Sequence, residues 1–290
     1  MSSTFFTESP HWRWFIVAYF FFGGLAGGSY FIATMLELFR RDRRLVQLGY
    51  LTAFPLVCLC GPLLTIDLGR PERFWHMLIQ SETFRPMIKI WSPMSLGSWA
   101  LLCFGGCAFL SFVAVLAERG WLGWPFLRHL GPRARVGRLV MAIGALLGLY
   151  VAGYTGVLLA VTNRPIWADT TLLGLAFLIS AASTSAALLI MLGSWGGVSG
   201  ESLAALERFD ASVLVLELVT IVALVASLGR VAMVWLNGWG VGLAVMLLGG
   251  VVLPLFLQFR PPSRGSIGPV LVLLGGLIFR TLIIFSSDQL

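Results

Sequence analysis

The stretch WFIVAYFFFGGLAGGSYFIATMLELF, residues 14–39, decides the fold class. The hydrocarbon core of a bilayer is about 30 Å thick, and a helix needs about 20 apolar residues to cross it. This stretch is long enough to cross once. It exceeds the 7–15 apolar residues typical of a cleavable signal, and no basic segment of the signal type precedes it. We therefore predict a transmembrane helix that stays in the mature protein.

Four glycines in this stretch predict close packing. Gly23 and Gly27 form one pair with a spacing of four residues, and Gly24 and Gly28 form a second pair. Small residues at this spacing let two membrane helices approach closely. We interpret them as a packing surface for another helix.

Seven more apolar stretches have a similar length. They cover residues 45–66, 91–117, 137–161, 167–193, 209–229, 239–258 and 267–286. Hydrophobic residues make up 58% of the chain and charged residues only 11%, whereas soluble domains carry about 25% charged residues. The sequence therefore predicts an all-α, polytopic membrane protein with about eight transmembrane helices, in a single integral membrane domain over residues 1–290.

The positive charge of the protein indicates its orientation in the membrane. The formal net charge is +7, and the arginines lie mainly in short loops between apolar stretches. This placement is typical of topology signals and lipid-headgroup contacts, and it argues against nucleic-acid binding. Twelve of the 20 Lys and Arg residues lie on the side that receives the loops after the first, third, fifth and seventh stretches. We predict that this side is cytoplasmic and that both termini are periplasmic.

The sequence offers no ligands for a metal at membrane depth. His11, His76 and His129 all lie in predicted loops, whereas haem held in a membrane bundle needs axial ligands within the helices. The cysteines do not form a CxxC motif or another metal-ligand spacing. We therefore expect no metal site, no haem and no iron–sulfur cluster in this protein.

Three carboxylates interrupt the apolar stretches or end them. Glu217 lies near the middle of 209–229, Glu37 near the cytoplasmic end of 14–39, and Asp67 directly after 45–66. Charged groups at membrane depth are costly and usually functional. Each is a candidate for a proton relay. The alternatives are a structural hydrogen bond for Glu217, and for Glu37 either simple solvation or an ion pair with nearby arginines.

A second group of polar residues gathers toward the predicted outer face. Arg70 follows Asp67 by three residues, Arg164 follows the fourth stretch, and Tyr154 lies within that stretch. A buried phenol needs a hydrogen-bond partner, which is either a ligand such as a quinone or a neighbouring helix. The loop from Asp67 to about residue 90 mixes arginines with aromatic residues, so we expect a short interfacial segment there.

Several of these motifs together resemble the NrfD/PsrC family, the membrane subunits of polysulfide-reductase-type complexes. They are Gly23–Gly28, Asp67–Phe74, Ser92–Gly97, Tyr154–Leu159 and Gly275–Arg280. The resemblance implies two four-helix bundles and a bound quinone, either menaquinone or ubiquinone. It also implies a partner subunit with four iron–sulfur clusters and a molybdenum or tungsten catalytic subunit, in the cytoplasmic membrane of a bacterium or archaeon. Tyr154 matches a tyrosine associated with the family's quinone pocket, and Asp67 matches the motif aspartate.

The combined prediction is a quinone-binding membrane anchor of a respiratory oxidoreductase complex, with no catalytic residue in this chain alone. It passes electrons between the quinone pool and the iron–sulfur partner, and it contacts membrane lipid. The predicted quinone-binding residues are Tyr154, Asp67, Arg70, Arg164 and His11, and the predicted proton relay is Glu217, Glu37 and Asp67. A proton-coupled transporter or channel and a purely structural anchor remain the alternatives. A pair of broken helices at matching positions would favour a transporter, and the sequence shows no such pair.

Overall fold

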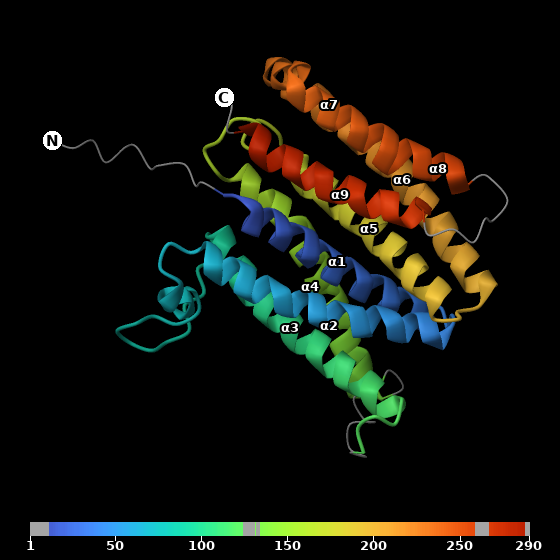
Figure 1. Cartoon of the computed structure of the whole chain (residues 1–290). Coiled ribbons are helices and arrows are strands. Elements are labelled where there is room, and N and C mark those ends of the chain that lie inside the picture. The colour runs from blue at the N-terminus through green and yellow to red at the C-terminus, as the bar shows by residue number, and fades with distance from the viewer. Residues whose placement is uncertain (1–11, 124–130, 132–133, 259–266, 288–290) are drawn as a thin grey trace.

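The computed structural model describes residues 12–123, 131, 134–258 and 267–287. Within these residues, eight helical spans are long and apolar enough to cross a membrane. The spans run side by side (Figure 1). They are α1 (Trp14–Leu38), α2 (Arg43–Asp67), α3 (Pro93–Glu118), α4 (Arg135–Ala160), α5 (Leu173–Trp195), α6 (Gly200–Leu228) extended by η3 (Gly229–Leu236), α7 (Gly238–Val245) with η4 (Met246–Val252) and α8 (Leu253–Gln258), and α9 (Ile267–Ser286). The predicted all-α, multi-pass membrane fold is confirmed.

The spans form two groups of four, as the family resemblance implies. The first bundle consists of α1 to α4, and the second consists of α5, α6, the combined span 238–258 and α9. Helices α1 and α5 pack against each other and against further helices of both groups, and Figure 1 shows them in the middle of the molecule. The junction between the bundles is therefore built on α1 and α5.

The glycines of α1 permit close packing both within the first bundle and at this junction. A Cβ atom on Gly27 would lie 2.2 Å from the backbone oxygen of Gly148 in α4, and one on Gly28 would lie 2.3 Å from Oγ of Ser185 in α5. Only glycine leaves room for these two contacts. The predicted close packing of α1 is confirmed, and its two glycine pairs face two different helices.

Two predicted helix starts were wrong. The fifth helix begins at Leu173 and not at 167, because Trp167 lies in a loop where it is fully buried and its Nε1 donates to the backbone oxygen of Ile283, at 2.6 Å. The sixth helix begins at Gly200 and not at 209. Its first turns carry charged residues, so an apolar pattern cannot reveal them.

The molecule has two ends, which we name after residues near them. The Trp14 end carries the start of α1, the loop 68–92 and the end of α9, and the Arg40 end carries the turns 39–42 and 196–199. The loop 68–92 contains the short helix η1 (Pro71–Met77), and Trp99 of α3 holds the loop by donating from Nε1 to the Met87 oxygen, at 3.1 Å. This arrangement places the loop beside the first bundle.

Candidate functional site

Tyr154 of α4 lies tightly against α3 in the first bundle. A Cβ atom on Gly97 would lie 2.0 Å from Cζ and 2.2 Å from Oη of Tyr154. Any larger residue at position 97 would therefore displace the phenol. The Ser92–Gly97 motif explains the approach, because Ser92 caps α3 by accepting from the Ser95 backbone N–H, at 3.4 Å, and α3 then presents Gly97 to Tyr154.

A cavity of about 340 Å³ adjoins this phenol, and we call it the tyrosine cavity. Its volume lies within the range of about 300–1,000 Å³ that is usual for small-molecule sites. The walls come from the end of the loop 68–92, from α3 and from α4. They are Ile90, Trp91, Pro93, Leu96, Leu149, Tyr150, Gly153, Tyr154 and Val157. The cavity is therefore mainly apolar, with two phenol groups in its wall.

The Tyr154 hydroxyl neither donates nor accepts a hydrogen bond among the described residues. Its ring stacks on Tyr150, with 5.7 Å between centroids, and Tyr19 of α1 belongs to the same buried core cluster. A buried phenol normally has a partner. The arrangement leaves this hydroxyl able to donate to a ligand in the tyrosine cavity.

Asp67 and Arg70 lie near the Trp14 end, but they do not line the tyrosine cavity. Asp67 is the last residue of α2 and is half-buried, whereas Arg70 is exposed in the loop. No salt bridge joins them in the described part of the protein. Both residues are placed on the surface of this end, where a second protein can reach them.

Arg164 lies in the loop between α4 and α5, at the same end of the molecule. It is buried, its guanidinium lies 5.2 Å from the ring centroid of Trp167, and its Nη1 donates to Oγ of Ser287 at 3.4 Å. These contacts connect the loop to the end of α9 in the second bundle. Arg164 is absent from the wall of the tyrosine cavity, and His11 lies outside the described residues.

The second bundle contains a buried cation that the sequence places in α9. Arg280 is 0% exposed. Its Nε donates to the Phe20 oxygen at 3.2 Å, and its Nη1 donates to the Gly276 oxygen at 2.8 Å and to Oγ of Ser180 at 3.3 Å. The guanidinium also lies over the ring of Phe177, 5.4 Å from its centroid. These contacts tie α9 to both α1 and α5.

Glu217 of α6 faces this cation. It is 5% exposed, and its electrostatic neighbours are Arg280, Ser180 and Ser183. This group of side chains comes from three helices of the second bundle, namely α5, α6 and α9. The predicted buried carboxylate thus has an opposite charge near it, on a helix that is distant in sequence.

Sequence reasoning missed Asp210, a second buried carboxylate in α6. It is 1% exposed and accepts from Nε2 of Gln258 at 2.8 Å. It precedes Glu217 by two helical turns, so both face the same side of α6. This seven-residue spacing was the available signal, but the predicted stretch 209–229 placed Asp210 at its very end, where a charged residue is ordinary.

Glu37 lies at the Arg40 end, in a surface cluster. Arg43 forms salt bridges with Glu37 and with Glu118, the latter at 2.5 Å. Beside the cluster, Asp42 accepts from the backbone N–H groups of Ser199 and Arg44, which lower the pKa of its carboxyl below the ordinary value. These contacts connect the turns of both bundles, and they give Glu37 partners that differ from those of Glu217.

The described residues contain no group of three or more His, Cys, Asp or Glu side chains that could hold a metal ion. The side chains of the tyrosine cavity that can donate hydrogen bonds are two phenols and the Trp91 indole, which suit an organic ligand with carbonyl oxygens. This chemistry fits a quinone.

Comparison with known proteins agrees with the fold and with the motifs. The sequence matches the family described as "Polysulphide reductase, NrfD" over residues 2–289. A polysulfide reductase polypeptide of Wolinella succinogenes is 28% identical over 274 residues, which cover 84% of each protein. A selenate reductase polypeptide of Mesobacillus selenatarsenatis is 34% identical over 97 residues, which cover 33% of the present sequence and 20% of that protein. The protein therefore belongs to the NrfD polysulphide reductase family.

Proposed function

We propose that this protein is the quinone-binding membrane subunit of a respiratory reductase complex, and that it lets a partner iron–sulfur subunit exchange electrons with the quinone pool. The observation that carries the proposal is the Tyr154 hydroxyl, which has no partner among the described residues and adjoins an apolar cavity of about 340 Å³. The two relatives support it, since their names denote parts of polysulfide and selenate reductases.

The residues of the tyrosine cavity have distinct roles in this proposal. A bound quinone supplies two-electron, two-proton redox chemistry. Tyr154 donates a hydrogen bond to a ring oxygen, which orients the ring and provides a proton route at that atom. Tyr150 and Trp91 offer aromatic faces against which a flat ring can stack.

The charged residues of the Trp14 end serve docking and positioning in this proposal. Arg70 is exposed and Asp67 is half-buried at the edge of the loop 68–92, so they are available to the iron–sulfur partner. Arg164 fixes the neighbouring loop through Trp167 and Ser287, and His11 precedes α1 in the sequence. A molybdenum or tungsten catalytic subunit would attach through that partner. The Trp14 end then faces the periplasm of a bacterial or archaeal cell.

Protons have a candidate route through the second bundle. Asp210, Ser183 and Gln258 each have a buried polar atom with no hydrogen-bond partner among the described residues, and such atoms are the usual sites of bound water. Glu217 lies between this group and Arg280. We propose Glu217, with Asp210, as the relay. In this relay, Glu37 would only be the group at which protons enter at the Arg40 end. Asp67 would only be the group at which protons leave at the Trp14 end.

The relay predicts a defect in proton movement. Glu217→Gln should slow proton uptake during quinone-linked turnover by about tenfold or more, because the amide cannot carry a proton. The measurement uses the complex in liposomes with a pH-sensitive dye. Glu201→Gln is the control, since Glu201 lies exposed at the start of α6. Normal proton uptake in Glu217→Gln, with normal assembly, would leave Glu217 a structural residue.

Purification under mild detergent tests the function itself. We expect the protein to co-purify with an iron–sulfur protein and with a molybdenum or tungsten protein, and we expect solvent extraction of the complex to release quinone. Mass spectrometry and metal analysis provide the readout. Partners without quinone would favour the structural anchor. A protein that purifies alone and transports a solute in liposomes would favour the transporter.

A further inference from the structure

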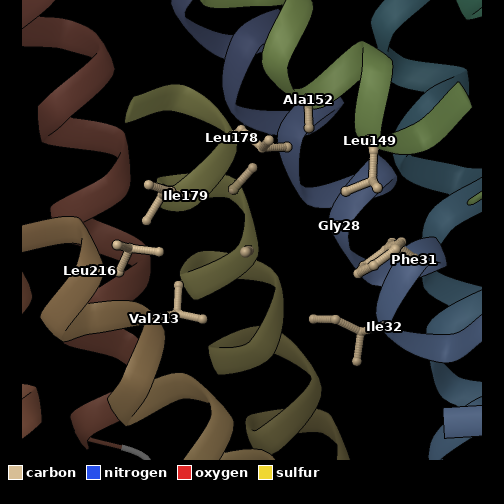
Figure 2. Close-up of a pocket in the computed structure, with 11 residues that line it drawn as sticks. Gly28, Phe31, Ile32, Leu149, Ala152, Leu178, Ile179, Val213 and Leu216 are labelled. Atoms are coloured by element: carbon tan, nitrogen blue, oxygen red, sulfur yellow. The ribbon is translucent and has the colours of Figure 1, made fainter. Parts of the chain in front are cut away.

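A second cavity lies at the junction of the two bundles, and we call it the inter-bundle crevice. Its volume is about 110 Å³. Figure 2 shows side chains from α1, α4, α5 and α6 facing a common space. The lining residues are Gly28, Phe31, Ile32, Leu149, Ala152, Leu178, Ile179, Ala181, Ala182, Val213 and Leu216.

The chemistry of this crevice selects a hydrocarbon. All of its lining residues are apolar or glycine, so water would find no hydrogen-bond partner among their side chains. An apolar cavity of about 150 Å³ holds a benzene ring, and the smaller crevice therefore suits a group such as an isoprene unit. Leu216 of the crevice wall is 50% exposed, so this part of the wall reaches the outer surface of the bundle.

The crevice adjoins the tyrosine cavity. Leu149 of α4 lines both. Tyr154 follows Leu149 by five residues, which is about 7.5 Å along a helix. The phenol lies toward the Trp14 end, and the crevice lies near the middle of its four helices. A molecule with a polar ring and an apolar tail can therefore place the ring at Tyr154 and the tail against Leu149.

We infer that the inter-bundle crevice binds the isoprenoid tail of the quinone whose ring occupies the tyrosine cavity. This inference rests on the proposed function and adds a second binding region to it. Small residues create the space, since Gly28, Ala152, Ala181 and Ala182 contribute little side-chain volume to the wall. Lipid is as apolar as the crevice, so the tail gains from close packing rather than from leaving water. The crevice thus selects quinones by their tails.

Filling the crevice tests the inference. Ala182→Phe places a ring in the space, and Leu216→Phe enlarges a side chain of the wall with less risk to folding because Leu216 is half-exposed. Binding is measured with the purified protein in nanodiscs of one lipid composition, by quenching of tryptophan fluorescence. The probes are menaquinone-4 and ubiquinone-4, each paired with its tail-free analogue, menadione or ubiquinone-0. We expect both variants to bind the tailed quinone about tenfold more weakly and the tail-free analogue as the unaltered protein does.

The matched control is Ala223→Phe, the same substitution at an exposed position of α6 outside the crevice. It should bind both probes as the unaltered protein does. Unchanged binding of the tailed quinone by both crevice variants would overturn the inference and leave the proposed function standing. The same conclusion would follow if the crevice variants lost a co-purified phospholipid while their binding of the tailed quinone stayed normal. An equal loss for both probes would also overturn it, because it would mean that the ring site was distorted. If the unaltered protein binds none of the probes, both the inference and the proposed function are wrong.

Discussion

Tyr154→Phe should lower quinone-linked turnover of the complex by about 100-fold, because the ring stays in place and only the proton-donating hydroxyl is lost. The hydroxyl has no hydrogen bond among the described residues, so its removal breaks no protein contact and should leave stability nearly unchanged. Electron transfer from the catalytic partner to an artificial dye should continue at its normal rate. The two rates measured on one preparation separate the quinone step from the rest of the complex.

A matched control for this substitution is Tyr50→Phe. Tyr50 is another buried phenol of the first bundle, but its hydroxyl bonds to Oγ1 of Thr34 at 3.1 Å and it does not line the tyrosine cavity. We expect normal quinone kinetics and a loss of about 1 kcal/mol of stability. Normal kinetics in Tyr154→Phe as well would contradict the assignment of Tyr154.

Gly97→Ala examines the same site without altering the phenol. The added Cβ would lie 2.0 Å from Cζ of Tyr154, so either the ring or α3 must move. We expect quinone-linked turnover to fall although the hydroxyl is still present. A defect in Gly97→Ala with none in Tyr154→Phe would show that the position of the ring matters and the hydroxyl does not.

The spans were predictable because membrane helices must satisfy their backbone hydrogen bonds internally and cover their surface with apolar side chains. The segment 14–39 satisfies both requirements within one stretch of sequence. Position 167 shows the limit of that reasoning. Trp167 extends an apolar run, but it is buried in a loop by α9, more than 100 residues away in sequence. Hydropathy indicates that a residue is buried, but it does not show whether that residue belongs to a helix or to a loop.

The site was only partly predictable, for a similar reason. Tyr154 was identified as a phenol within a span, but Tyr19 satisfies the same criterion and was overlooked in an apolar run of α1. The structure places both phenols in one buried core cluster. It also separates residues that the sequence grouped, since Arg164 contacts α9 and is absent from the wall of the tyrosine cavity. Residues that share a membrane face need not share a pocket, because position around each helix decides which of them meet.

Arg280→Met should destabilise the protein by about 3–5 kcal/mol, which is typical for removing one of two opposite charges that are buried near each other. Methionine keeps much of the side-chain volume, so the loss comes from the three hydrogen bonds to Phe20, Gly276 and Ser180 and from the charge near Glu217. Unfolding of the purified protein, followed by circular dichroism during titration with denaturing detergent, measures the change.

The same experiment shows whether Glu217 and Arg280 form one unit. If they do, Glu217→Gln introduced into Arg280→Met should recover part of the lost stability, because it removes a carboxyl group whose opposite charge has gone. The matched control is Glu217→Gln combined with Arg164→Met, since Arg164 is also buried but contacts Trp167 and Ser287; no recovery is expected there. An equal effect of Glu217→Gln on stability in the unaltered protein and in Arg280→Met would show that the two charges act independently. Recovery would mean that a fixed cation controls how readily Glu217 holds its charge, which is the property that a proton relay at membrane depth requires.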